Sequence, residues 1–117
     1  MANSETILSA QAHPGDSTVT VVTGTQYRGD GYYGRSDGFH TVQYSIDSFI
    51  GTIAIEATLA ADPAEADWFT VYTQAYPVVN ETGTTTSVIT NFTGNYVWIR
   101  AVVTYTDGNV TSIKLNH

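Results

Sequence analysis

Residues 95–105 read Asn-Tyr-Val-Trp-Ile-Arg-Ala-Val-Val-Thr-Tyr, and after Asp107-Gly108 the chain continues with Asn-Val-Thr-Ser-Ile-Lys-Leu over residues 109–115. Both runs alternate between apolar and polar side chains, which is typical of strands with one buried face. Asp-Gly between two such runs favours a two-residue hairpin, because both positions tolerate a positive φ. The sequence therefore predicts an antiparallel hairpin here. Its inward-facing residues are expected to be Val97, Ile99, Ala101 and Val103, together with Val110 or Ile113.

Comparable runs recur along the rest of the chain. Further strands are expected over residues 18–23, 39–46, 51–59, 68–73 and 87–92, with glycine, aspartate or asparagine between them. In the strand at 68–73 we expect Phe69 and Val71 to point inward, and Asp62-Pro-Ala-Glu65 offers one turn of helix before it. Six to eight short strands of this kind predict an all-β fold, an antiparallel β-sandwich of jelly-roll or immunoglobulin-like type.

The length of 117 residues favours one domain. We expect residues 18–117 to form the β-sandwich and residues 1–17 to form an N-terminal arm, a candidate for docking. Residues 27–38 contain four glycines and two aspartates, which predicts a long surface loop.

The charge balance limits the classes of partner. Four basic residues, none of them clustered, stand against eleven acidic ones for a net charge of −7. Nucleic acids and anionic membranes both require an array of cations, so neither is an expected partner. The chain has no cysteine, no run of about 20 apolar residues and no signal sequence at its start, which indicates synthesis in the cytoplasm without disulfides.

Catalytic patterns are missing from the sequence. The three histidines are far apart, no cysteine completes a zinc site, and no Gly-x-Ser-x-Gly occurs. Asp30 with Asp37, and Asp62 with Asp67, are the carboxylate pairs that a glycosidase or a calcium site could use, yet all four lie in turn-forming stretches where aspartate bonds to backbone amides. We therefore expect no enzyme activity, no metal and no cofactor.

The aromatic residues are the most informative candidates for contact. Trp98 alternates out of phase with Val97 and Ile99, which predicts a large ring on the face opposite the core. Such rings stack on sugars or anchor subunit interfaces, unless both faces of the sheet are covered within the monomer. The candidate interface or ligand-contact residues are Tyr32, Tyr33, Trp68, Tyr72, Tyr96 and Trp98.

Three segments resemble stretches of a known group of proteins. They are Gly-Asp-Gly-Tyr-Tyr-Gly-Arg-Ser-Asp-Gly-Phe-His-Thr-Val-Gln at 29–43, the run at 49–69 that begins Phe-Ile-Gly-Thr-Ile, and Asn-Phe-Thr-Gly-Asn-Tyr-Val-Trp-Ile-Arg at 91–100. They resemble stretches in small virion structural proteins of marine tailed phages of the cyanophage type. The resemblance covers about residues 29–117.

The resemblance implies a non-enzymatic virion protein. Its first implication is a capsid decoration protein that assembles as a homo-oligomer with other virion proteins on the particle. A tail, neck or fibre-associated protein is the alternative within the virion. From the residues themselves, a carbohydrate-binding module that contacts glycan through residues 27–38 and a Trp/Tyr platform is a further alternative.

Overall fold

The computed structural model describes residues 5–13, 19–33, 38–76 and 84–116. Within these ranges it contains nine β-strands and two short 3-10 turns, η1 (Asp30–Tyr33) and η2 (Glu65–Asp67). Every strand pair is antiparallel. The fold is therefore all-β, as the alternation of side chains predicted.

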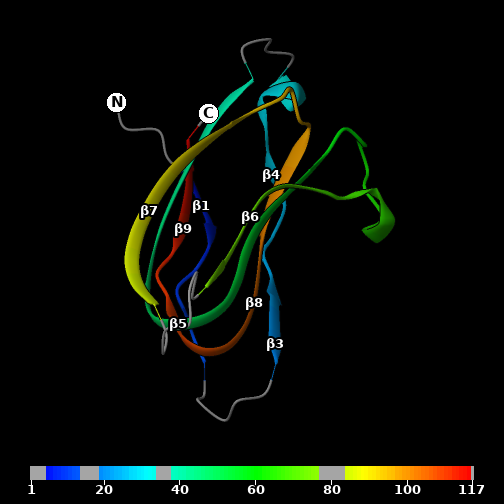
Figure 1. The fold of residues 1–117 in the computed structure, drawn as a ribbon. Coiled ribbons are helices and arrows are strands. Elements are labelled where there is room, and N and C mark those ends of the chain that lie inside the picture. The colour runs from blue at the N-terminus through cyan, green and yellow to red at the C-terminus, as the bar shows by residue number, and fades with distance from the viewer. Residues whose placement is uncertain (1–4, 14–18, 34–37, 77–83, 117) are drawn as a thin grey trace.

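A long strand pair forms the centre of the molecule. One member is β5 (Phe39–Thr58), and the other is β8 (Trp98–Val110) followed by β9 (Ile113–Asn116). Their register runs from Thr58 opposite Trp98 to Thr41 opposite Asn116. β5 and β8 both curve at the lower end of the molecule in Figure 1, so the pair passes through two layers.

The flanking strands complete two facing layers. The first layer has the order β1 (Glu5–Leu8), β9, the first half of β5, and β7 (Thr84–Thr93). The second has β3 (Thr20–Thr23) and β4 (Tyr27–Arg28), then β8, the second half of β5, and β6 (Phe69–Tyr76). The short β2 (Gln11–Ala12) pairs with the end of β8. β3 and β4 lie one after the other along β8 and share one edge position, so each layer has four strand positions. This arrangement is a jelly roll and not an immunoglobulin-like sandwich.

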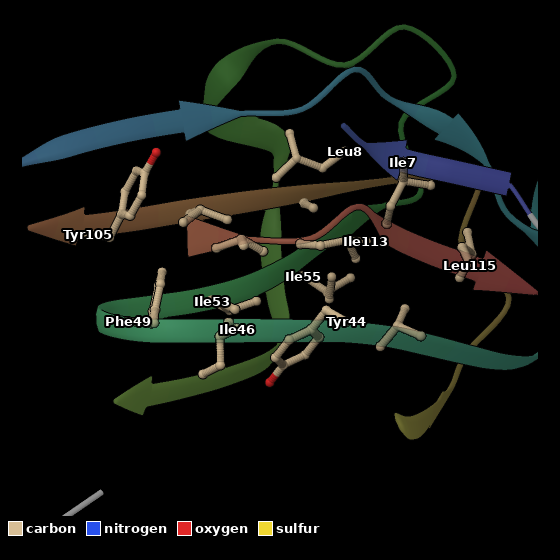
Figure 2. Packing of buried hydrophobic residues seen from close by; sticks show 14 of the residues in the cluster. Ile7, Leu8, Tyr44, Ile46, Phe49, Ile53, Ile55, Tyr105, Ile113 and Leu115 are labelled. Carbon is tan, nitrogen blue, oxygen red and sulfur yellow. The ribbon is translucent and has the colours of Figure 1, made fainter. Parts of the chain in front are cut away.

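The bend of the central pair requires an irregular backbone. Even-numbered residues of β5 are buried up to Ile46, and odd-numbered apolar residues are buried from Phe49 onward. The register shifts in between, where Ser48 has a φ of 51°, and Gly108 on β8 has a φ of 92°. The extra residue of this β-bulge keeps the apolar side chains on one side while the strand doubles back beside Phe49 (Figure 2).

The core lies between the two layers and draws on both (Figure 2). Full burial of one Ile or Phe side chain contributes about 1.5–3 kcal/mol, so this cluster supplies the main favourable term in folding. Its fully buried members with the largest side chains include Ile7, Tyr44, Phe49, Ile53, Ile55, Ile99, Val103, Ile113 and Leu115.

One polar network lies at the side of this core. The hydroxyl of Tyr44 is 2.7 Å from that of Tyr72 and 2.8 Å from that of Tyr76, so it forms a hydrogen bond with each and can donate to only one of them. Burial, together with these bonds, raises the pKa of Tyr44 well above its ordinary value. The three tyrosines thus connect the first layer to β6.

The hairpin predicted at Asp107-Gly108 is wrong. β8 continues through these residues to Val110 and pairs with β5, where Ile50 lies opposite Asp107. The tolerance of Gly108 for a positive φ serves the bulge and not a turn. Most of the inward-facing set is confirmed, since Ile99, Ala101, Val103, Val110 and Ile113 are all buried, but Val97 is only half-buried and is not part of the core.

Three other expectations are also corrected. The predicted strands at 39–46 and 51–59 form the single 20-residue strand β5, and the described residues form nine strands where six to eight were expected. Phe69 is 69% exposed, because it lies at the open end of the sandwich. The helical turn forms at η2 and not at Asp62, with the carboxylate of Asp67 accepting from the amide of Ala64.

The boundary between an arm and a domain at residue 17 is wrong as well. β1 pairs with β9, and its residues Ile7 and Leu8 are only 1% and 6% exposed. Burial of these two side chains makes β1 part of the sandwich. Residues 1–4 and 14–17 of the predicted arm lie outside the described residues.

Replacing Gly108 with alanine tests the bend. A Cβ at this position would overlap the carbonyl oxygen of Ser48, and the φ of 92° is strained for any side chain. We expect Gly108→Ala to lower the free energy of unfolding by about 1–3 kcal/mol, measured by urea denaturation. Asn109→Ala, at the exposed neighbouring position, should change it by less than about 0.5 kcal/mol. Equal stability of the two variants would contradict the account of the bend.

Candidate functional site

A row of aromatic and arginine side chains lies on the outer face of the second layer. We call this surface the outer aromatic face, and it consists of Arg28, Tyr32, Trp68, Trp98 and Arg100. Trp98 and Arg100 alternate with the inward-facing Ile99 and Ala101 of β8, both 0% exposed. The prediction that Trp98 lies opposite the core is therefore confirmed.

One half of the outer aromatic face is built around Trp98. Arg28 on β4 lies directly opposite Trp98 on β8. Tyr32 of η1 packs onto the indole with 5.1 Å between ring centroids, and the Arg28 guanidinium carbon lies 4.8 Å from the centre of the Tyr32 ring. The indole Nε1 donates to the carbonyl of Ala61 at 3.0 Å, which fixes its orientation.

The other half is built around Arg100. Its guanidinium carbon lies 4.4 Å from the centre of the Trp68 ring. Its Nη1 and Nη2 donate to the two carboxylate oxygens of Glu65, each at 3.0 Å, and its Nε donates to Glu56 Oε1 at 2.7 Å. A two-pronged contact between guanidinium and carboxylate holds Arg100 rigidly beneath the indole of Trp68.

The contact between Arg100 and Glu65 shifts the pKa values of both groups. Hydrogen bonding to Arg100 lowers the pKa of Glu65, and hydrogen bonding to Glu65 raises the pKa of Arg100. Glu65 is 83% exposed while Arg100 is 10% exposed, so the arginine is covered by its carboxylate partners. At neutral pH the exposed cation of the outer aromatic face is Arg28.

The six predicted contact residues separate into different places. Tyr32, Trp68 and Trp98 come together on the outer aromatic face. Tyr72 instead joins the buried network of Tyr44. Tyr96 packs against His40 and Phe92 at one end of the sandwich, and its hydroxyl donates to the carbonyl of Thr93 at 3.1 Å. The side chain of Tyr33 lies outside the described residues.

Tyr96 borders an apolar pocket that the sequence did not indicate. The pocket has a volume of about 480 Å³ and is lined by apolar side chains that include Leu59, Phe69 and Val71. Leu59 is 71% exposed. Phe69 was expected to point inward because its run alternates, and alternation does not reveal where a strand passes the end of the facing layer.

A second pocket follows the bend on the first layer. It has a volume of about 550 Å³ and is lined mostly by short polar side chains from β2, β5, β7 and β8. The hydroxyls of Ser45 and Ser87 are 2.8 Å apart, and Thr85 donates to Asp47 Oδ1 at 3.1 Å. Sequence reasoning missed this groove because it exists only where the bend brings four strands together.

The sequence offered two alternative kinds of site, a pair of catalytic carboxylates and a metal site. Across residues 5–13, 19–33, 38–76 and 84–116, no three His, Cys, Asp or Glu side chains are placed to hold a metal ion. The proposed pair of Asp30 and Asp37 stays a prediction, because the structure does not describe the side chain of Asp30 or any part of Asp37. Asp67 has the turn role expected from the sequence, since it accepts the amide of Ala64.

Among the described residues, no helix has the length and apolar character needed to span a membrane.

Glu65→Gln tests the ion pair that anchors Arg100. Because the pKa of Glu65 in the folded state is lowered from 4.5, its contribution to stability is present above pH 4.5 and is lost as the pH falls through the lowered value. We expect the wild type to have a higher Tm than Glu65→Gln at neutral pH, and the difference to disappear on acidification. Thermal unfolding followed by circular dichroism over a pH series measures it.

The matched control is the same comparison in an Arg100→Lys background. An ammonium cannot make the two-pronged contact, so the difference in Tm should shrink at every pH. A difference that persists unchanged at low pH would show that the ion pair is not its source.

The likenesses of this chain to known proteins are weak. No family model and no curated protein matches the sequence. Among solved structures, the chain is similar to the K3 cleaved adhesin domain of Lys-gingipain from Porphyromonas gingivalis W83, with 12% identity and a TM-score of 0.47, covering 82% of this chain and 62% of that one. It is also similar to the C-terminal CBM6 of the marine laminarinase LamC from Zobellia galactanivorans, with 12% identity, a TM-score of 0.42 and coverage of 98% and 91%.

A third solved structure, that of the Gx strain of infectious bursal disease virus, has 13% identity and a TM-score of 0.40. It covers 97% of this chain, and this chain spans 31% of that one. All three likenesses have TM-scores below 0.5.

Proposed function

We propose that this chain is a non-enzymatic structural subunit of a tailed-phage virion, a capsid decoration protein that docks on other virion proteins through its outer aromatic face. The observation that carries the proposal is the tilted ring contact of Tyr32 with Trp98, with Arg28 beside it. Tyr, Trp and Arg are the side chains most enriched among interface residues with large binding energies. The resemblance of residues 29–117 to phage virion proteins is the reason for proposing that the particle is a tailed-phage virion.

The rigidity of this face supports a docking role. Trp98 is fixed by its bond to Ala61, and Arg100 is fixed by Glu56 and Glu65 beneath Trp68. Side chains that are already ordered lose little conformational entropy on binding. The same face would serve a tail, neck or fibre position, and the location in the particle distinguishes these.

A second candidate function is glycan binding, favoured by two features. Tyr32, 45% exposed, supplies an aromatic surface on which a sugar ring can stack. The groove along the bend offers hydroxyl, amide and carboxylate groups, among them Ser45, Asp47 and Asn109, that match the hydrogen bonding of sugar hydroxyls. The groove and the aromatic surface belong to different layers, so a single glycan would use one of them.

Tyr32→Ala tests the docking role in particles of the phage that encodes the chain, purified on a density gradient. We expect the wild-type chain to remain on the particles at a fixed copy number after washing. Loss of an aromatic anchor should reduce that copy number about tenfold or more, because each 1.4 kcal/mol corresponds to a factor of ten in affinity. Quantitative mass spectrometry of the particles measures it, and electron microscopy locates the chain.

Phe39→Ala is the matched control, since Phe39 is 53% exposed and lies on β5 in the first layer. Its copy number should equal that of the wild type. If the chain instead stays in the soluble fraction, and a glycan array shows saturable binding that Trp98→Ala abolishes, the virion proposal is wrong and the glycan candidate replaces it.

A further inference from the structure

The strand β7 forms a long outer edge of the first layer. Within the described residues it pairs with β5 and with no other strand. Its ten residues, Thr-Thr-Thr-Ser-Val-Ile-Thr-Asn-Phe-Thr, include no charged residue and no proline. Proteins usually protect such edges with lysine, proline or a bulge, because the unpaired backbone groups can bind another strand. The edge of β7 has none of the sequence protections.

The pairing of this edge with β5 is regular over most of its length. β7 pairs with β5 without interruption from Thr86, opposite Ile46, to Thr93, opposite Phe39, and its one register shift lies at the end of the strand, between Ile46 and Phe49 of β5. The strand that forms the same edge of the second layer, β6, has a register shift opposite Ile55 and Glu56. A bulge of that kind turns an edge away from a partner strand. β7 is therefore the edge that is ready to accept another strand.

The exposed side chains of β7 have a symmetric order. Thr85, Ser87, Ile89, Asn91 and Thr93 are exposed in alternation with half-buried residues. The central member, Ile89, is 67% exposed, although it is large and apolar. An antiparallel copy of the same strand, centred on Ile89, would place Ile89 opposite Ile89, Ser87 opposite Asn91, and Thr85 opposite Thr93.

These three pairs are chemically complementary. Two isoleucines across the axis bury apolar surface that is otherwise exposed to water. Asn91 already accepts a hydrogen bond from Thr41 through Oδ1 at 2.8 Å, so its amide group can donate to the hydroxyl of Ser87 in the second copy. Thr85 and Thr93 form a pair of β-branched side chains, which is a favourable cross-strand combination.

We propose that a second copy of this chain adds its β7 to this edge, forming a two-fold dimer in which the first layers of both copies make one continuous sheet. The order of the exposed side chains selects a second copy, because it is its own complement about Ile89. Two chains of net charge −7 repel unless their contact avoids the charged residues, and β7 supplies such a contact. This interface lies in the first layer, away from the outer aromatic face, so the dimer and the docking role can be tested separately.

The first experiment measures the mass of the full chain by sedimentation equilibrium over a wide concentration range. We expect a monomer–dimer equilibrium built on the 12.6 kDa chain. Ile89→Lys places two ammonium groups opposite each other across the axis and should raise the dimer dissociation constant about a hundredfold. Val21→Lys is the matched control, because Val21 is a 59% exposed residue of the edge strand β3 in the second layer. It should leave the dissociation constant unchanged.

The second experiment tests the register, and it uses the fact that the chain has no cysteine. With mild oxidant, Ile89→Cys should form a disulfide-linked dimer, because each cysteine faces its own copy at a distance that a disulfide spans. Ser87→Cys faces Asn91 and should not form one. A chain that is monomeric at all concentrations and not cross-linked through Ile89→Cys would overturn the proposal. A dimer that Tyr32→Ala dissociates and Ile89→Lys does not would overturn it too, by placing the interface on the outer aromatic face.

Discussion

A single strand pair has to keep its apolar side chains on one side while it folds over on itself. β5 carries buried residues at even positions up to Ile46 and at odd positions from Phe49, and the residue added at the bend makes this change of phase. Without it, half of the strand would direct its apolar side chains to solvent. Gly108 on the paired strand leaves room for the bend, since a Cβ there would overlap Ser48.

The surfaces of the molecule follow from this constraint. With Ile99 and Ala101 facing inward, Trp98 and Arg100 must face outward, where η1 and the segment before β6 bring Tyr32 and Trp68 to them. On the opposite side of the central pair, β7 pairs with β5 alone among the described strands and forms an edge. The outer aromatic face and the β7 edge thus belong to different layers, and each provides its own surface for contact.

Local alternation predicted the strands, most of the inward-facing residues and the outward position of Trp98. It could not predict pairing between distant segments, so the hairpin at Asp107-Gly108 was wrong: a positive φ at glycine suits a turn and a bulge equally. Phe69 was assigned to the core because its run alternates, although the facing layer ends before it. The contacts of Arg100 with Glu56 and Glu65 depend on the same long-range pairing, and no spacing in the sequence indicates them.

β5 and its partner strands make the two layers one cooperative unit. Native-state hydrogen exchange tests it most directly, by comparing amides of Val42 and Tyr44 in the first layer with those of Ile53 and Ile55 in the second. Because one continuous strand carries all four, they should exchange with one shared free energy, equal to that of global unfolding. Two distinct free energies, one for each layer, would contradict it.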